Sequence, residues 1–372
     1  MFHCFTMRNC FLFLFGLLAF SCKNGTEKTS QDNEMEKSLT AEQVKLVYDN
    51  MKAFPNSTEL SIAIINGDST KYFGGRWEKD TIEQIDNSEH LFEVGSITKV
   101  FTATILASLV VEEKIKLKDP IQKYLDFDLR TDEEITFEQL ANHTSGLPWI
   151  SSNLDLYEYP ENPYKTYDQN KLKKYLIDNL ELKSQPGKDY AYSNLGAALL
   201  GFVMTEITES TFEELLHHKI FKAYGMSNST TVRTKINGEI VPGLNPDGKE
   251  ISNWDFQAIA PAGAAISSAE DLVKFANAQF NSNDKPIVLT QQPTFNANDQ
   301  FKVGLGWHIL DKNNVELLWH NGGTGGYSSS MALDLNNRQA VIVLSNVSTF
   351  HPQKGNIDQL CFALMASLEK NE

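Results

Sequence analysis

Strand patterns lie at both ends of this chain of 372 residues, and helical patterns fill the middle. Near the beginning, Leu60, Ile62 and Ile64 alternate with small or polar residues, and Asn66-Gly67 supplies a tight hairpin turn. Three further strand patterns lie near the end, at residues 315–319, 327–335 and 339–346. Because strands bury their apolar faces within a packed domain, this order predicts one antiparallel sheet assembled from both ends of the chain.

One helical pattern in the middle is apolar on nearly every side. It runs from Ser96 to Glu113, and a helix of this kind is normally buried inside a domain. Another helix begins after Thr40, with Gln43 three residues later as its capping-box partner. Further helical patterns cover residues 137–141, 172–180, 195–207, 212–221, 268–280 and 357–368. The expected fold is α/β, of the α+β kind: an antiparallel sheet flanked by N- and C-terminal helices, with a large helical insertion.

The first residues have the pattern of an export signal. Arg8 precedes the apolar run FLFLFGLLAF, which is short for a membrane span and suits a signal peptide. The small residue Ser21 then precedes Cys22, as in a bacterial lipobox, so cleavage would leave Cys22 as a lipid-modified N-terminus. A plain signal peptide cut nearby, or an uncleaved anchor, are the alternatives. We therefore expect a bacterial cell-envelope lipoprotein, exported and attached to a membrane by its lipid, on the periplasmic side or the surface.

These patterns divide the chain into three parts. Residues 1–21 are the expected signal peptide, 22–39 a polar lipidated tether, and 40–372 one folded domain. Within that domain we expect a sheet part at about 40–100 and 261–372 and a helical part at about 101–260.

Charge and cysteine content exclude two kinds of protein. The chain has 48 acidic and 33 basic residues, a net charge of -15, and no basic patch, so nucleic acid is not an expected partner. Of its four cysteines, three lie in or next to the signal, and Cys361 lies on an apolar helix. A disulfide framework is therefore not expected.

Ser96 and Lys99 begin the apolar helix and are candidates for nucleophilic chemistry. Residues three apart share one helical face, so the lysine nitrogen can lie beside the serine hydroxyl, which needs a nearby proton acceptor. A helix start also directs free N–H groups at a reacting carbonyl. The alternative is a helix cap with a solvent-exposed lysine, but a lysine within a buried helix needs a reason.

Two further segments carry residues of the same chemistry. Tyr192-Ser193-Asn194 precedes the apolar helix at 195–207; a phenol can move protons beside a lysine, and an amide can bind a substrate amide. The alternative interpretation is a helix start with Asn194 as N-cap.

The third segment, HNGGTGG at residues 320–326, lies after one strand pattern and before another. Its four glycines allow a substrate to lie against bare backbone, unless they form only a hairpin loop.

In this order, the three segments resemble the class C β-lactamases and the DD-carboxypeptidase branch of the penicillin-binding proteins, in which Y-x-N occupies the second place. The resemblance begins near residue 40 and continues to the end of the chain. It includes LANHTSGLP at residues 140–148 and two short segments at 261–264 and 267–272. It implies a β-lactamase/transpeptidase-like fold and a serine hydrolase without a cofactor.

The resemblance also implies roles for the individual residues. Ser96 would attack the carbonyl and become acylated, Lys99 would ease its deprotonation, and Tyr192 would act as general base and then donate to the leaving nitrogen. His320 would join the proton network or face a substrate carboxylate. The N–H groups of Ser96 and Gly323 would form an oxyanion hole. The residues expected to bind substrate are Asn194, Asn321, Gly322, Gly323 and Thr324.

One departure from the family pattern concerns the substrate. His320 occupies the place where many relatives have lysine, and histidine is mostly neutral near pH 7. Efficient β-lactam hydrolysis is therefore in doubt, although the acyl-enzyme chemistry is not. The expected substrates are D-Ala-D-Ala-type peptides of peptidoglycan or β-lactams. The alternatives are an esterase acting on small esters, a slowly deacylating penicillin sensor, and a cell-wall binding module.

Two remaining clusters have simpler interpretations. His217-His218 lies on a helix without a partner at ligand spacing, so no metal site is expected. The aromatic residues between 149 and 164 either line the substrate cleft or cap the helical part, and the sequence leaves both open; they are Trp149, Tyr157, Tyr159 and Tyr164.

Overall fold

The computed structural model describes residues 39–312 and 315–369. The expected signal peptide and nearly all of the tether, including Cys22, lie outside the described residues. Within the described part, no helix is both long enough and apolar enough to cross a bilayer.

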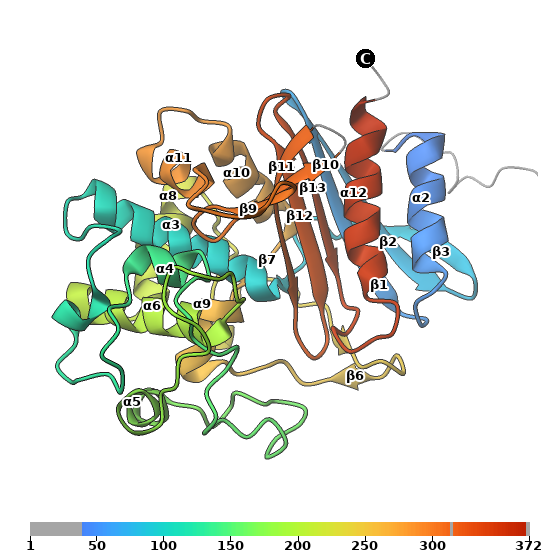
Figure 1. The fold of residues 1–372 in the computed structure, drawn as a ribbon. Coiled ribbons are helices and arrows are strands. Elements are labelled where there is room, and N and C mark those ends of the chain that lie inside the picture. Colours follow the sequence, from blue (N-terminus) through green and yellow to red (C-terminus); the bar gives the residue numbers. More distant parts are fainter. Residues whose placement is uncertain (1–38, 313–314, 370–372) are drawn as a thin grey trace, which may run out of the picture.

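The centre of the fold is one antiparallel sheet with strand order β3-β2-β1-β13-β12-β11-β10-β9-β8 (Figure 1). Its first strands pair with its last, since Leu60 of β1 lies opposite Ser345 of β13. The predicted sheet built from both ends of the chain is therefore confirmed. The bounds are β1 Thr58–Asn66, β2 Ser69–Glu78, β3 Thr81–Ile85, β8 Phe295–Asn298, β9 Phe301–Val303, β10 His308–Lys312, β11 Val315–Gly323, β12 Ser328–Asp334 and β13 Gln339–Ser345.

The helices α2 (Ala41–Met51) and α12 (Gly355–Glu369) lie side by side on one face of this sheet (Figure 1). The predicted capping box is present, because Thr40 and Gln43 exchange hydrogen bonds at the start of α2. Apolar side chains of both helices pack on β13, and Cys361 of α12 is buried among them, with no disulfide partner among the described residues.

The helical part covers the opposite face (Figure 1). At its centre is α3, in which every side chain from Thr98 to Leu109 is buried, as its all-round apolar pattern predicts. The helix bounds are α3 Thr98–Val111, α4 Phe137–Ala141, α5 Gln169–Asp178, α6 Asn194–Thr208, α7 Phe212–Leu216, α8 Lys222–Tyr224, α9 Ala260–Gly263, α10 Ala269–Gln279 and α11 Lys285–Gln291. Two small ladders complete this part, pairing β4 Phe92–Glu93 with β7 Ile266–Ser267 and β5 Gly243–Leu244 with β6 Glu250–Ile251.

The strand β11 is longer than the sequence predicts. The expected loop begins at His320, whereas the strand continues to Gly323, which pairs with Ser328 of β12. On its other side β11 pairs with β10 only as far as Trp319. The glycine-containing end of β11 is therefore paired on one side only, and the edge it leaves lies next to the start of α3.

Candidate active site

Ser96 lies in a tight turn between β4 and α3. The preceding Gly95 has φ +51°, a conformation that side chains disfavour. A β-carbon on Gly95 would lie 2.4 Å from the backbone nitrogen of Gly323. The missing side chain therefore lets the turn that carries Ser96 pack directly on the end of β11.

Lys99 lies one turn further along and is buried. Its side-chain nitrogen is 3.1 Å from the Ser96 hydroxyl oxygen and 2.6 Å from the carbonyl oxygen of Ala262. Burial holds the pKa of Lys99 well below its ordinary value, because no carboxylate compensates for the lost hydration. The neutral amine is therefore accessible without the usual alkaline conditions.

Tyr192 completes this group from a distant part of the chain. The Lys99 nitrogen lies 4.7 Å from the centre of the Tyr192 ring. Burial raises the pKa of the Tyr192 phenol, and a hydrogen bond with the Ser96 side chain opposes that rise in part. The structure thus brings together the hydroxyl, amine and phenol that the sequence separates.

The segment before α6 is held in place by its own cap. The Ser193 side chain accepts a hydrogen bond from the Gly196 N–H at 2.8 Å and donates to the Pro148 carbonyl at 2.6 Å. The N-cap is therefore Ser193 and not Asn194, the alternative considered from the sequence. Asn194 is left with a buried side-chain oxygen that has no hydrogen-bond partner among the described residues, and it lines the cleft above Ser96.

The end of β11 forms one wall of the same cleft. A β-carbon on Gly322 would lie 2.7 Å from the backbone nitrogen of Ser96, so the two backbones are in direct contact. Gly322, Gly323 and Asn321 all line the cleft. This contact brings the Ser96 and Gly323 amides to one place, which is the arrangement that an oxyanion hole requires.

His320 lies behind the cleft. It is buried and is not among the cleft-lining residues. Its Nδ1 lies 2.6 Å from the carbonyl oxygen of Asn321, so this nitrogen carries the hydrogen, and Nε2 has no hydrogen-bond partner among the described residues. Burial, with the nearby His308 and Lys99, holds the pKa of His320 well below its ordinary value. The ring is therefore neutral and offers an acceptor where the family's lysine would offer a cation.

Thr324 also lies away from the cleft. It is fully buried beside the carboxyl of Glu93. Glu93 itself is buried, which raises its pKa, and it accepts a hydrogen bond from the Trp254 N–H at 3.0 Å. Thr324 and Glu93 are thus buried neighbours of the cleft-lining residues Gly323 and Trp254.

Several cleft residues are absent from the sequence predictions. The Tyr190 hydroxyl lies 2.9 Å from Nε2 of His308, and the His308 ring stacks on His320 with centres 4.9 Å apart. Asp358 of α12 accepts a hydrogen bond from the Asn321 amide at 2.8 Å. No spacing links these residues to Ser96, although Tyr190 lies two residues before Tyr192 and could have been suspected from that alone.

The cleft has a volume of about 810 Å³, and aromatic side chains form a substantial part of its lining. Its aromatic residues are Trp149, Tyr157, Tyr164, Tyr190, Tyr192, Trp254 and Phe350. The question left open by the sequence is thereby answered for three residues of the 149–164 segment, which line the cleft. Tyr159 is not among the lining residues.

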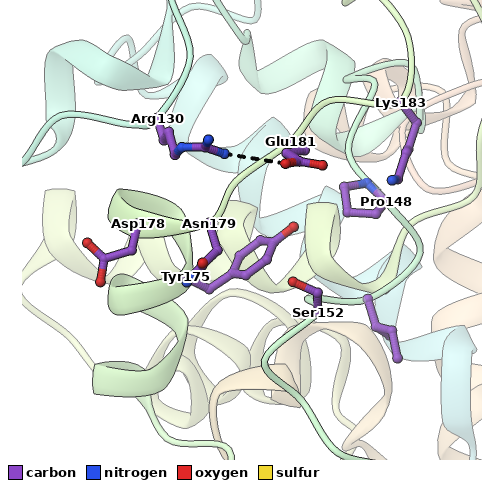
Figure 2. Close-up of a pocket in the computed structure, with 9 residues that line it drawn as sticks. Arg130, Pro148, Ser152, Tyr175, Asp178, Asn179, Glu181 and Lys183 are labelled. Atoms are coloured by element: carbon purple, nitrogen blue, oxygen red, sulfur yellow. Dashed lines mark ion pairs between the residues drawn. The ribbon is translucent and has the colours of Figure 1, made fainter.

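A second, smaller pocket is lined in part by residues at the beginning of the same segment (Figure 2). Its volume is about 380 Å³. Pro148, Ile150 and Ser152 line this pocket, whereas Trp149 between them lines the cleft. Arg130 and Glu181 form an ion pair of 3.6 Å across its upper side (Figure 2). One short segment thus forms a wall of both cavities.

No metal centre is evident within the described ranges. They contain no group of three or more His, Cys, Asp or Glu side chains placed to hold an ion. His217 and His218 contact each other at the end of α7, with ring centres 5.3 Å apart.

Two curated proteins illustrate the similarity to known sequences. "Protein flp" of Staphylococcus aureus (strain MW2) is 25% identical over 281 residues, which are 71% of this chain and 54% of that protein. "Unguisins hydrolase ungD'" of Aspergillus campestris is 24% identical over 327 residues, which are 78% of this chain and 58% of that protein. The chain thus spans little more than half the length of these relatives.

Solved structures share the fold. The octameric penicillin-binding protein homologue of Pyrococcus abyssi superposes with a TM-score of 0.75 at 22% identity, over 88% of this chain and 77% of that chain. The β-lactamase/D-alanine carboxypeptidase of Yersinia pestis gives 0.73 at 21% identity, over 91% and 99%. A D-stereospecific amidohydrolase of Streptomyces gives 0.72 at 21% identity, over 87% and 98%. The β-lactamase/transpeptidase-like fold is therefore confirmed.

The family itself is shown by the sequence. The pattern that defines the Beta-lactamase family matches residues 49–360 of the 372, a range that contains the serine, lysine and tyrosine gathered at the start of α3. The protein therefore belongs to the Beta-lactamase family of serine hydrolases.

Proposed function

We propose that the protein is a serine acyl hydrolase in which Ser96 carries the acyl group of the substrate. The observation that supports this most directly is the 3.1 Å contact between the Ser96 hydroxyl and the buried Lys99 nitrogen. A serine hydroxyl becomes a useful nucleophile when a proton acceptor lies at hydrogen-bond distance. A buried amine of lowered pKa is such an acceptor.

The preferred protonation states of Lys99 and Tyr192 suggest a different proton transfer for each residue. Burial favours the neutral amine of Lys99 and the neutral phenol of Tyr192. The Lys99 nitrogen donates to the Ala262 carbonyl and to the Ser96 oxygen; in the neutral amine, rotation about the Cε–Nζ bond keeps a hydrogen on Ala262 and turns the lone pair to the Ser96 proton. We therefore assign deprotonation to Lys99 and protonation of the leaving group to Tyr192, whereas the sequence led us to expect Tyr192 in both roles.

The reaction has two halves, acylation of Ser96 and hydrolysis of the acyl-enzyme. The Ser96 oxygen bonds to the carbonyl carbon while Lys99 takes the proton. The bond to the leaving group breaks as Tyr192 gives it a proton, and Lys99 returns a proton to Tyr192. Water then attacks the acyl carbon, its proton passes to the same pair, and Ser96 regains its hydrogen as the acid leaves. The amides of Ser96 and Gly323 would stabilise the oxygen anion in both halves.

Two classes of substrate fit the proposed acyl transfer to Ser96. D-alanyl peptides of peptidoglycan and β-lactams are the first candidates, because two of the solved structures that share the fold are described as β-lactamase/D-alanine carboxypeptidases. His320 favours a second candidate, an esterase or amidase whose substrate lacks a carboxylate. Its neutral, buried ring provides no cation for such a group.

We also propose a location for the enzyme, based on the lipobox-like segment before residue 23. The lipobox-like Cys22 supports an exported, membrane-anchored enzyme that acts on substrates in the cell envelope. Cell-wall peptides would then be within its reach.

Labelling and turnover together test this proposal. The full chain, Ser96→Ala and the control Ser282→Ala, a change at an exposed serine, would be mixed with a fluorescent penicillin and with p-nitrophenyl acetate. We expect Ser96-dependent reaction with at least one of them. Stable labelling indicates a sensor or peptidase, rapid loss of label a β-lactamase, and ester turnover without labelling an esterase. Activity of Ser96→Ala close to that of the control would refute the proposal.

A further inference from the structure

The most exposed apolar side chains of the described residues gather at the mouth of the catalytic cleft. Tyr157 is 87% exposed, Phe350 63% and Trp149 52%, and all three line the cleft that contains Ser96. Phe350 comes from a part of the chain remote from Trp149 and Tyr157, so their gathering does not follow from one apolar segment. Exposed apolar surface of this kind marks a binding site.

The aromatic surface continues from the mouth toward the catalytic residues. The ring of Phe350 lies 6.2 Å from that of Trp254, which lies 5.4 Å from the ring of Tyr164. Tyr164 is buried, and its phenol interacts with the side chain of Asn194. A series of neighbouring aromatic rings therefore leads from Phe350 at the mouth of the cleft to Asn194.

The charges in the cleft offset each other. Its charged lining residues are Lys354 and Asp358, of opposite sign and four residues apart at the start of α12. The Lys354 nitrogen lies 3.3 Å from the Thr349 hydroxyl, and the Asp358 carboxylate accepts from Asn321 at 2.8 Å. The lining therefore has no net charge that would select an ionic substrate.

The position of the rings assigns them to the acyl side of the substrate. Tyr192, which we propose as donor to the leaving group, lies next to His143, with ring centres 4.5 Å apart. Asn194, by contrast, is anchored to the aromatic side, because its N–H donates to the Trp149 carbonyl at 2.9 Å. The aromatic surface is therefore assigned to the acyl side of the substrate through its contact with Asn194.

We propose that the cleft selects substrates whose acyl group carries an uncharged aromatic ring, bound by Trp149, Phe350, Trp254 and Tyr164. This inference rests on the proposed acyl-hydrolase function for its relevance to catalysis, but the binding itself does not depend on turnover. Burial of one phenyl ring in such a surface strengthens binding by roughly tenfold to a hundredfold.

A series of esters with one leaving group tests the selectivity. We expect kcat/KM of the full chain to be about tenfold to a hundredfold higher for p-nitrophenyl phenylacetate than for p-nitrophenyl acetate, after correction for their rates of alkaline hydrolysis. Trp149→Ala and Phe350→Ala should each lower kcat/KM for the phenylacetate more than for the acetate, and so remove much of this preference. The matched control is Tyr48→Ala, at a ring 40% exposed that packs on Trp77, away from the cleft. Equal corrected values for the two esters would overturn the inference.

A binding measurement separates this inference from the proposed function. With Ser96→Ala, which cannot form an acyl-enzyme, tryptophan fluorescence would follow titration with phenylacetamide and with acetamide. Tighter binding of phenylacetamide, weakened by Phe350→Ala and unchanged by Tyr48→Ala, supports the aromatic site whether or not esters are hydrolysed. Equal binding of the two amides, alongside Ser96-dependent turnover in the wild type, refutes the aromatic site and leaves the acyl-hydrolase proposal standing.

Discussion

A β-carbon on Gly322 would lie 2.0 Å from the carbonyl oxygen of Val94, far inside van der Waals contact. This approach joins the end of β11 to the turn that carries Ser96. The Val94 carbonyl also accepts a hydrogen bond from the Ser329 hydroxyl of β12 at 2.9 Å. Neither backbone can retreat without disturbing the sheet, so the geometry of the proposed oxyanion hole depends on the absence of a side chain here.

The first prediction is that Gly322→Ala strongly lowers kcat. The added methyl group must push β11 away from Ser96, and loss of aligned oxyanion donors costs roughly 10² to 10³ in kcat. We expect stability to fall as well, by about 1–3 kcal/mol, from overpacking. Steady-state kinetics and urea denaturation would measure both. Gly238→Ala is the control, because its nearest contact would be an ordinary 3.5 Å, and it should change neither. A fully active Gly322→Ala enzyme would contradict the close approach.

The second prediction concerns the charge of Lys99. Lys99→Arg places a permanent cation in the buried site, and this cation cannot accept the Ser96 proton. The variant should therefore lose at least about 10³ in kcat/KM, as expected when a general base is removed. In the wild type, the acid limb of the kcat/KM profile should reflect an amine whose pKa lies well below 10.5, with activity retained at neutral pH. An enzyme active only near pH 10 would show instead that Lys99 keeps its ordinary pKa.

The third prediction is a loss of stability in mild acid. Burial lowers the pKa of His308 to about 4 and holds the pKa values of His143 and His320 well below their ordinary value. The unfolded chain therefore binds more protons than the folded protein between about pH 6.5 and pH 4, so stability present above pH 6.5 is lost as the pH falls through this range. Lys99, where it is protonated at these lower pH values, also opposes the protonation of the three rings.

Denaturation at several pH values would measure this effect. His308 alone should contribute on the order of 3 kcal/mol of the difference between pH 7 and pH 4. His308→Gln should make the curve of unfolding free energy against pH less steep. His218→Gln serves as the control, since His218 lies on the exposed side of its helix, and it should leave the curve unchanged. A wild-type stability constant from pH 7 to pH 4 would contradict the neutral histidine cluster.

Local features of the fold could be predicted because they depend on neighbouring residues. The capping box of Thr40 and Gln43, the hairpin at Asn66-Gly67 and the buried α3 follow from spacing and polarity within a few turns or strands. The strand end at Gly322 and Gly323 could not be predicted this way. Glycine disfavours strands on its own, and only pairing with β12 and contact with the Ser96 turn keep this segment extended.

The site could be predicted as far as its short motifs allowed. Ser96, Lys99 and Tyr192 carry the family pattern, whereas the position of His320 depends on tertiary packing. Its ring turns inward onto His308, which lies on the neighbouring strand. The aromatic lining depends on contacts between remote segments, as between Trp254 and Phe350, which no periodicity in the sequence encodes.

The fourth prediction tests the anchor. Expressed in a bacterium, the full chain should sediment with membranes, and Cys22→Ser should appear in a soluble fraction because no thiol remains for lipid attachment. Cys361→Ser is the control, at a buried cysteine of α12, and it should remain with the membrane. Membrane sedimentation of Cys22→Ser equal to that of wild type would argue for an uncleaved anchor.

In the proposed mechanism, Ser96 carries the acyl group of the substrate between the two half-reactions. Acid quenching during turnover of a p-nitrophenyl ester, followed by digestion and mass spectrometry, would locate that group. We predict one added acyl mass on the peptide that contains Ser96, and none in Ser96→Ala. An acyl group on another residue, or continued turnover by Ser96→Ala at the wild-type rate, would contradict the account.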